Sequence, residues 1–224
     1  MPLPESGAVA AVVGATGLIG SHLVRQLLLS GKYARVVVFA RGAIPPDLAS
    51  AENLDWRQTD PLDPELVAWP EYQVDVLFCA LGTTRAVSGV AGQAWIDRDM
   101  VVGFVQCAVA AGVSLVSIVS ALGADAQSRV FYSRLKGQME DAVVNAGAET
   151  VHLWRPSVLE GERELKRPGE QFWGWLLGLL PLSKISPRAG SDVAAAMIAA
   201  TSAATPGVFR YYVPDIEVFN RKTH

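Results

Sequence analysis

Residues 12–31, VVGATGLIGSHLVRQLLLSG, decide the fold, because they join an apolar strand to an amphipathic helix through a glycine loop. Gly14, Gly17 and Gly20 lie at the turn and at the opening of the helix. Glycine permits a tight turn and a close approach to a pyrophosphate, and the helix N-terminus supplies free N–H groups and partial positive charge. The stretch predicts a dinucleotide site, although its G-x-x-G-x-x-G spacing differs from the commoner G-x-G-x-x-G.

Short apolar stretches alternate with helix-length segments along the rest of the chain. Apolar runs without polar alternation are typical of parallel strands that are covered on both faces. The pattern predicts one α/β domain over residues 1–224, with a Rossmann-type doubly wound parallel sheet and a small C-terminal substrate-side cap formed by residues 157–224. The expected strands are 8–15, 34–41, 53–60, 74–81, 113–120 and 149–156, with a further candidate at 208–214, and the expected helices are 18–30, 92–111, 128–146 and 190–203.

The composition argues against several classes of protein. A net charge of −3 with 18% charged residues provides no basic field for nucleic acid. Cys79 and Cys107 both lie in apolar stretches, which favours reduced thiols in the core and a reducing compartment. No basic segment precedes the first apolar run, so no signal peptide is expected and a cytoplasmic location is predicted.

Two apolar segments raise the question of a membrane. Residues 100–124 carry no charge, but Gly112 divides them into a helix-like part and a short β-branched part, which predicts a buried helix and strand rather than a membrane span. Residues 172–180, FWGWLLGLL, are apolar nearly all round a helix. Core packing or a substrate-pocket wall is the first interpretation, a homodimer patch the second, and membrane-surface adhesion the third, because a strongly basic face is missing.

The end of the second expected strand indicates which dinucleotide binds. A carboxylate there would hold the 2′-hydroxyl of NAD, whereas an arginine suits the 2′-phosphate of NADP. Arg41 occupies that place, and the nearest acid, Asp47, lies beyond two prolines. NADP(H) is therefore favoured over NAD(H), the alternative being a solvated arginine at a strand end.

Residues 130–137, VFYSRLKG, place Tyr132 and Lys136 four residues apart, on one face of the expected helix. Ser120 ends a predicted central strand, and strand carboxyl ends face the ligand crevice of a doubly wound sheet, so the three side chains can converge. A tyrosine exchanges protons near neutral pH only when its phenolate is stabilised, which a neighbouring lysine ammonium would do, while a serine can hydrogen-bond the substrate oxygen. Ser120, Tyr132 and Lys136 are the candidate catalytic residues.

The chain resembles the short-chain dehydrogenase/reductases in their extended or atypical branch, and within them the HIV Tat-interacting oxidoreductase group and its bacterial relatives. The resemblance rests on GATGLIG, TDPLD, CALGTTR, VSALGA, the Tyr132-x-x-x-Lys136 spacing and RPSVLEG. It implies that Asp60 lies on the adenine side of the cofactor and that the Arg-Pro loop closes over the nicotinamide. The cofactor-binding residues expected together are Gly14, Thr16, Gly17, Leu18, Ile19, Gly20, Arg41, Asp60, Leu81, Gly82, Lys136 and Pro156.

Two positions depart from the pattern of that family. Asp97 lies by spacing where many members carry an asparagine of a proton relay, and a carboxylate there could still hold a water. Ala121 stands where a second serine is common in the group, so Ser120 would act without that neighbour.

Three further polar residues have ordinary interpretations. His22 and His152 have no second ligand at metal spacing beside them, so each is expected to be a packed or surface histidine and no metal site is predicted. Arg85 in LGTTR could face substrate or cofactor phosphate, or cap a loop.

These observations predict an NADP(H)-dependent oxidoreductase that acts on a small carbonyl or alcohol. The main alternative is a non-catalytic NADPH-binding sensor or regulator, against which the complete Ser120, Tyr132 and Lys136 set argues. Sugar-nucleotide epimerase or dehydratase chemistry is a third hypothesis, weakened because few residues follow Pro156 to build a nucleotide-sugar site.

Overall fold

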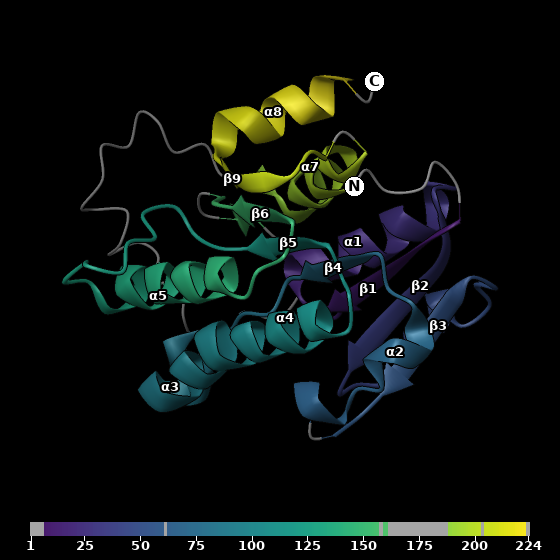
Figure 1. Ribbon diagram of the computed structural model, residues 1–224, viewed down its shortest axis with the longest axis horizontal. Helices are drawn as coiled ribbons and strands as arrows, with labels where there is room; N and C mark the ends of the chain where they lie inside the picture. Colours follow the sequence, from purple (N-terminus) through teal and green to yellow (C-terminus); the bar gives the residue numbers. More distant parts are fainter. Residues whose placement is uncertain (1–6, 61, 157–158, 161–187, 203, 223–224) are drawn as a thin grey trace.

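A parallel sheet organises the computed structural model, which describes residues 7–60, 62–156, 159–160, 188–202 and 204–222. Within these residues the main sheet has seven strands in the order β3-β2-β1-β4-β5-β6-β9 (Figure 1). Every neighbouring pair runs parallel, and β1 pairs with both β2 and β4. The order reverses between β1 and β4, and in such folds ligands bind at the strand carboxyl ends beside this switch. The predicted doubly wound Rossmann-type sheet is confirmed.

The bounds of the elements follow. The strands are β1 (Ala8–Val13), β2 (Tyr33–Ala40), β3 (Leu54–Gln58), β4 (Val76–Cys79), β5 (Leu115–Val119), β6 (Thr150–Trp154), β7 (Leu159–Glu160), β8 (Arg188–Ala189) and β9 (Gly207–Tyr211). The helices are α1 (Leu18–Leu29), α2 (Trp69–Tyr72), α3 (Arg85–Ala94), α4 (Val101–Ala110), α5 (Phe131–Asn145), α7 (Gly190–Thr201) and α8 (Val213–Lys222), with short turns η1 (Pro46–Leu48) and η2 (Pro64–Leu66) and the π-helical turn η3 (Trp95–Met100).

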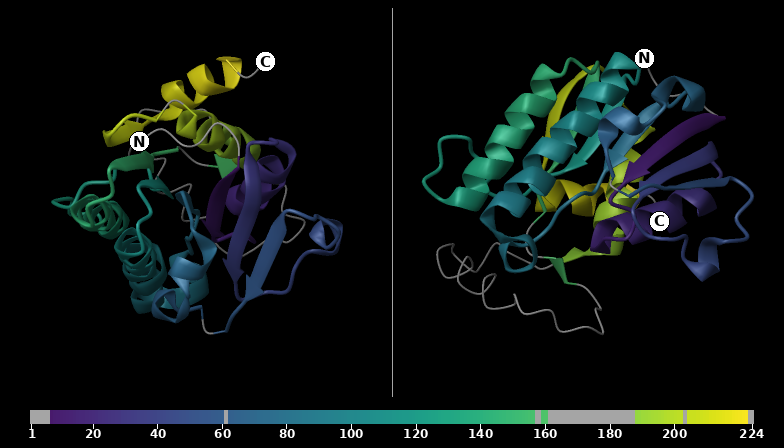
Figure 2. Two further views of the ribbon diagram at one scale, coloured as in Figure 1. Left: turned by 45° about the vertical axis from the view of Figure 1, so that its right-hand side comes forward. Right: turned by 90° about the horizontal axis from the view of Figure 1, so that it is seen from below.

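Helices cover both faces of the sheet (Figures 1 and 2). Side chains alternate along each strand, so Val12 of β1 packs on the face that α1, α7 and α8 cover, while Val13 packs on the face covered by α4 and α5. On the second face, Phe104 of α4 and Met139 of α5 are fully buried. The unalternated apolar strands of the sequence are thus explained by burial on both sides.

The segment from 85 to 110 differs from the expected helix at 92–111. The helical stretch begins at Arg85, bends at Gly89, whose φ is +70°, and passes through η3 before α4. The sequence pattern did not indicate this start, because the glycines at 89 and 92 interrupt the apolar periodicity. π-helical turns often lie at functional sites, and this one carries Asp97.

The uncharged segment 100–124 divides as expected. Gly112 takes a left-handed backbone with φ of +97° and separates the buried helix α4 from the buried strand β5. No helix among the described residues is long and apolar enough to cross a membrane.

The described part of residues 157–224 completes the sheet and its helical layer. The candidate strand at 208–214 is found as β9, which pairs with β6 as a parallel edge strand, and α7 packs against α1. The predicted cap over 161–187, with its apolar segment 172–180, lies outside the described residues. The substrate-side cap and the homodimer patch stay predictions.

Candidate functional site

The glycine loop between β1 and α1 packs against the end of β4. Gly14 has a φ of +83°, and a Cβ there would lie 2.5 Å from the Ala80 carbonyl carbon. A Cβ on Gly20 would overlap the Gly14 carbonyl oxygen, whereas one on Gly17 would lie 3.2 Å from that oxygen. Glycine is therefore needed at positions 14 and 20 for the loop to close. Gly17 is the N-cap residue of α1, and no side chain among the described residues forms a capping hydrogen bond with the first turn of this helix. This leaves the helix N-terminus able to accept a phosphate group.

The residues after β2 and β3 include Arg41 and Asp60, which the sequence predicts as cofactor-binding residues. Arg41 follows the last residue of β2 and is exposed. Asp47 forms an ion pair with Arg25 of α1, at 2.7 Å between Oδ2 and Nη2. The nearest acid after β2 is thus engaged by another arginine, and Asp60 is exposed shortly after β3. An exposed guanidinium at this strand end suits a 2′-phosphate.

Lys136 and Asp97 form a buried ion pair between α5 and η3. Lys136 Nζ lies 3.1 Å from Asp97 Oδ1, and the two side chains are 2% and 1% exposed. The other carboxylate oxygen of Asp97 accepts a hydrogen bond from the Thr83 N–H at 3.2 Å. A Cβ on Gly82 would lie 3.4 Å from Asp97 Oδ1. Asp97 therefore connects Lys136 to residues 82–83, the loop that leaves β4 beside the glycine loop.

The electrostatics of this pair differ from the sequence expectation. Burial raises the pKa of the Tyr132 phenol; Lys136 lowers it and Asp97 raises it again, and the net direction is upward. Lys136 does favour the phenolate, as expected, but burial of the phenol outweighs it and Asp97 adds to the effect of burial. Burial lowers the pKa of Lys136, but Asp97 and Tyr132 raise it more, so Lys136 is held as an ammonium.

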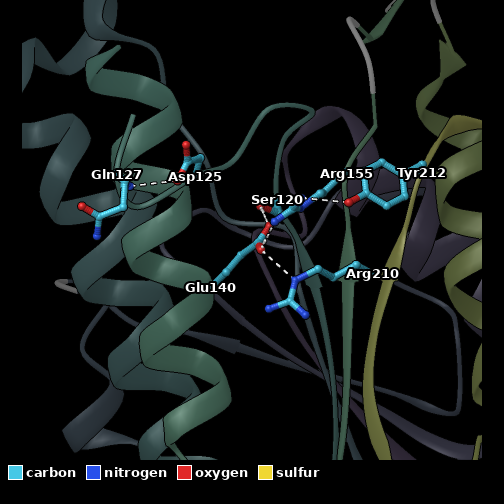
Figure 3. Close-up of polar contacts among 7 residues, drawn as sticks. All are labelled: Ser120, Asp125, Gln127, Glu140, Arg155, Arg210 and Tyr212. Carbon is cyan, nitrogen blue, oxygen red and sulfur yellow. Dashed lines mark hydrogen bonds and ion pairs between the residues drawn. The ribbon is translucent and has the colours of Figure 1, made fainter. Parts of the chain in front are cut away.

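Ser120 belongs to a second buried cluster, centred on Glu140 of α5 (Figure 3). Ser120 Oγ donates a hydrogen bond to Glu140 Oε1 at 2.5 Å. Arg155 binds the same carboxylate with two nitrogens, Nε to Oε1 at 2.9 Å and Nη2 to Oε2 at 2.6 Å. Arg210 Nε lies 3.6 Å from Oε2. Glu140 is 1% exposed, so this carboxylate ties α5 to the end of β5, to β9 and to the residue after β6.

The Arg-Pro loop has two parts with different contacts. The Arg155 guanidinium is directed to Glu140 and also donates from Nη1 to the Tyr212 hydroxyl at 3.0 Å. The carbonyl of Pro156 accepts a hydrogen bond from the Leu122 N–H at 3.1 Å, which joins this loop to the one that follows Ser120. Leu81, Gly82 and Pro156 thus follow β4 and β6 at the carboxyl edge of the sheet, the edge where the cofactor is expected.

The sequence reading missed Glu140 and Arg210, and it did not foresee the pairing of Asp97 with Lys136. A signal for Glu140 was present, because it follows Lys136 by four residues and Tyr132 by eight, on the same helix face. Arg210 had no comparable signal, since its place beside Glu140 follows from the pairing of β9 with β6.

The remaining singled-out residues take ordinary places. His152 is buried on β6 and packs edge-on against Phe209 and Tyr211, and burial lowers its pKa to about 4. The interpretation as a packed histidine is confirmed. Arg85 is exposed at the first residue of α3, and both interpretations of it stay predictions.

A parallel sheet of this order, with a glycine loop at its switch point, defines an NAD(P)-binding protein with an oxidoreductase-type fold. The chain belongs to the NAD(P)H-binding family, whose model matches residues 14–160. It is also a homologue of Protein HTATIP2 from Rattus norvegicus, with 30% identity over 198 residues that cover 88% of this chain and 81% of the relative. The predicted relationship to the HIV Tat-interacting group is confirmed by this homology.

Two other comparisons bear on location and fold. Protein FMP52, mitochondrial, from Eremothecium gossypii is 35% identical over 164 residues, covering 71% of this chain and 70% of the relative. Because that relative is named as mitochondrial, the cytoplasmic location stays a prediction. The structure of MoeE5 in complex with UDP-glucose and NAD has a TM-score of 0.67 at 17% identity, covering 97% of this chain and 82% of that one. This similarity is one of fold.

Proposed function

We propose that this protein is an NADP(H)-dependent oxidoreductase that acts on a small carbonyl or alcohol, with Ser120, Tyr132 and Lys136 as its catalytic residues. The observation that carries the proposal is the buried pair of Lys136 and Asp97, at 3.1 Å, beside Gly82 in the loop after β4. A buried ammonium is costly to maintain, and its position between the cofactor loops and Tyr132 gives it a chemical use.

The cofactor site is assigned to residues that have room or charge for it. The pyrophosphate would be held at the start of α1 by Thr16, Gly17, Leu18 and Ile19. Of the three loop glycines, Gly17 has the most free space at its Cβ position, so a phosphate could approach the backbone there. Arg41 would bind the 2′-phosphate, and Asp60 would lie on the adenine side. When bound, the cofactor supplies or accepts a hydride at its nicotinamide.

The protein residues supply binding, orientation and a proton. Tyr132 Oη would exchange a proton with the substrate oxygen, and Lys136 would hold both the tyrosine and the nicotinamide ribose. The hydroxyl proton of Ser120 is directed to Glu140, so Ser120 Oγ would accept a hydrogen bond from the hydroxyl of an alcohol substrate.

A non-catalytic NADPH sensor is the rival hypothesis from a different class. The two are separated by turnover on a panel of small aldehydes, ketones and sugar nucleotides, followed by NADPH absorbance. We expect one small carbonyl to be reduced, and Tyr132→Phe to lower its turnover about a hundredfold or more, the usual scale for the loss of a positioned acid. Its cofactor affinity should be unchanged, because the ring is retained. Full turnover by Tyr132→Phe would contradict the proposed chemistry.

The cofactor preference has its own test at Arg41. Arg41→Ala removes a charge-assisted contact that NAD(H) cannot make, so NADPH binding should weaken about tenfold or more while NADH binding changes little. Calorimetric titration with each cofactor measures both. Arg221→Ala, at an exposed arginine of α8, is the matched control. An equal loss for both cofactors would refute the assignment of Arg41.

A further inference from the structure

Asp97 stands at the meeting point of three parts of the site. It lies in η3, its Oδ1 contacts the Lys136 ammonium of α5, and its Oδ2 accepts the Thr83 N–H from the loop after β4. Both carboxylate oxygens are therefore used, and the side chain is 1% exposed. A carboxylate fixed in this way cannot turn aside or be screened by solvent.

We infer that Asp97 is a positioning residue that offsets part of the charge of the Lys136 ammonium, so that the buried Tyr132 keeps its proton into the alkaline range and the site is held ready for carbonyl reduction. The inference rests on the proposed function, and it specifies that Tyr132 is protonated in the enzyme before substrate binds. A lone lysine ammonium would favour the phenolate of Tyr132, which is the form needed to take a proton from an alcohol. A buried carboxylate 3.1 Å from that ammonium opposes this stabilisation of the phenolate.

Among the residues that the structure describes, the other titratable groups around the pair do not restore a positive charge. Lys136 also faces the Cys79 thiol at the end of β4, and burial raises the pKa of that thiol to about 11, so it is neutral. One turn further along α5, Glu140 faces Arg155 and Arg210, whose charges are directed to its own carboxylate. Burial first, and Asp97 in addition, raise the pKa of Tyr132 against the opposing effect of Lys136.

The reduction step balances with the proton on Tyr132. A bound reduced cofactor would supply the hydride for the carbonyl carbon, the C=O π electrons would move to oxygen, and that oxygen would take the proton of Tyr132 Oη. The tyrosine regains a proton from water, and the alcohol and NADP⁺ leave. In this direction the wild-type site starts with its acid already protonated, and the rate should fall only at alkaline pH.

The test is a spectroscopic titration that needs no substrate. The protein has five tyrosines, so the signal of Tyr132 must be separated from the other four. The ultraviolet absorbance of tyrosinate is measured against pH in the wild type and in Tyr132→Phe, and the difference between the two curves reports the ionisation of Tyr132. We expect no difference signal up to about pH 10, where an ordinary tyrosine titrates. In Asp97→Asn, which keeps an acceptor for the Thr83 N–H, the signal of Tyr132 should move to lower pH than in the wild type. Asp99→Asn, at a surface carboxylate paired with Arg98, is the matched control and should shift nothing.

Two outcomes would overturn the inference. One is a Tyr132 phenolate in the wild type below the pH of an ordinary tyrosine, a result that does not depend on the folding of any Asp97 variant. The other is an Asp97→Asn protein whose Tyr132 titrates where the wild type does. In an active enzyme the alkaline fall of kcat/KM for reduction should shift with the spectroscopic signal. If either of these titration results is found while Tyr132→Phe still abolishes turnover, only the inference about Asp97 is rejected. A fully active Tyr132→Phe enzyme would instead reject the proposed function.

Discussion

Two buried ionic clusters lie one turn apart on α5, and they differ in what they hold together. The first is the pair of Lys136 and Asp97, which joins α5 to η3 and to the loop after β4. The second is Glu140 with Arg155 and Arg210, which joins α5 to β9 and to the residue after β6, and which also accepts the Ser120 hydroxyl. Their central side chains are almost equally buried, at 2% and 1% exposed. Burial alone therefore does not show which cluster serves the chemistry and which one stabilises the fold.

The distribution of contacts does distinguish them. Two partners of Glu140, Arg155 and Arg210, are side chains of the scaffold, and its third partner is Ser120 of the proposed catalytic set. The cluster borders an open hollow of about 350 Å³ lined by polar residues that include Asp125, Gln127 and Asp141. The pair of Lys136 and Asp97 instead lies beside Gly82 and interacts with Tyr132. We interpret the Glu140 cluster as structural support and the Lys136 pair as the chemical centre.

The largest effect on stability is expected at Glu140. Glu140→Ala would leave two arginines facing an empty place, and loss of one partner from a buried ionic cluster typically costs about 3–5 kcal/mol. Urea unfolding of the cofactor-free protein measures the change in the free energy of unfolding. Asp141→Asn, at the exposed neighbouring acid, should change it by less than about 0.5 kcal/mol. If Glu140→Ala does not fold, Glu140→Gln provides a measurable loss. A Glu140→Gln protein as stable as the wild type would show that the cluster supports nothing.

Much of the fold could be predicted from the sequence, because its signals are local. The glycine loop, the unalternated strands and the break at Gly112 each depend on a few consecutive residues. The Tyr132 and Lys136 spacing was likewise readable on one helix.

The electrostatic partners could not be read in the same way. Asp97 and Lys136 are far apart in sequence and meet only because η3 packs against α5. Arg155 was expected in the loop over the nicotinamide, yet its guanidinium binds Glu140. The net direction of the Tyr132 pKa is likewise set first by burial of the phenol, and Asp97 adds to it, and both are properties of the folded chain. Charge balance inside a buried cluster is a tertiary property, so the spacing of residues along the chain does not predict it.

The smallest effect on stability, combined with a large effect on turnover, is expected when the Lys136 pair is removed as a unit. Lys136→Met alone would leave Asp97 as a buried carboxylate without its cation, which should cost about 3 kcal/mol or more of stability. In the double variant Lys136→Met/Asp97→Asn both charges are gone, Met keeps much of the lysine volume, and Asn still accepts the Thr83 N–H. Replacing a buried ion pair by uncharged residues of similar volume is often neutral, so the double variant should unfold within about 1 kcal/mol of the wild type. Its turnover should nevertheless fall about a hundredfold or more, because Tyr132 and the ribose lose their common partner. A double variant that was strongly destabilised but still active would reverse the assignment and make the Lys136 pair the support.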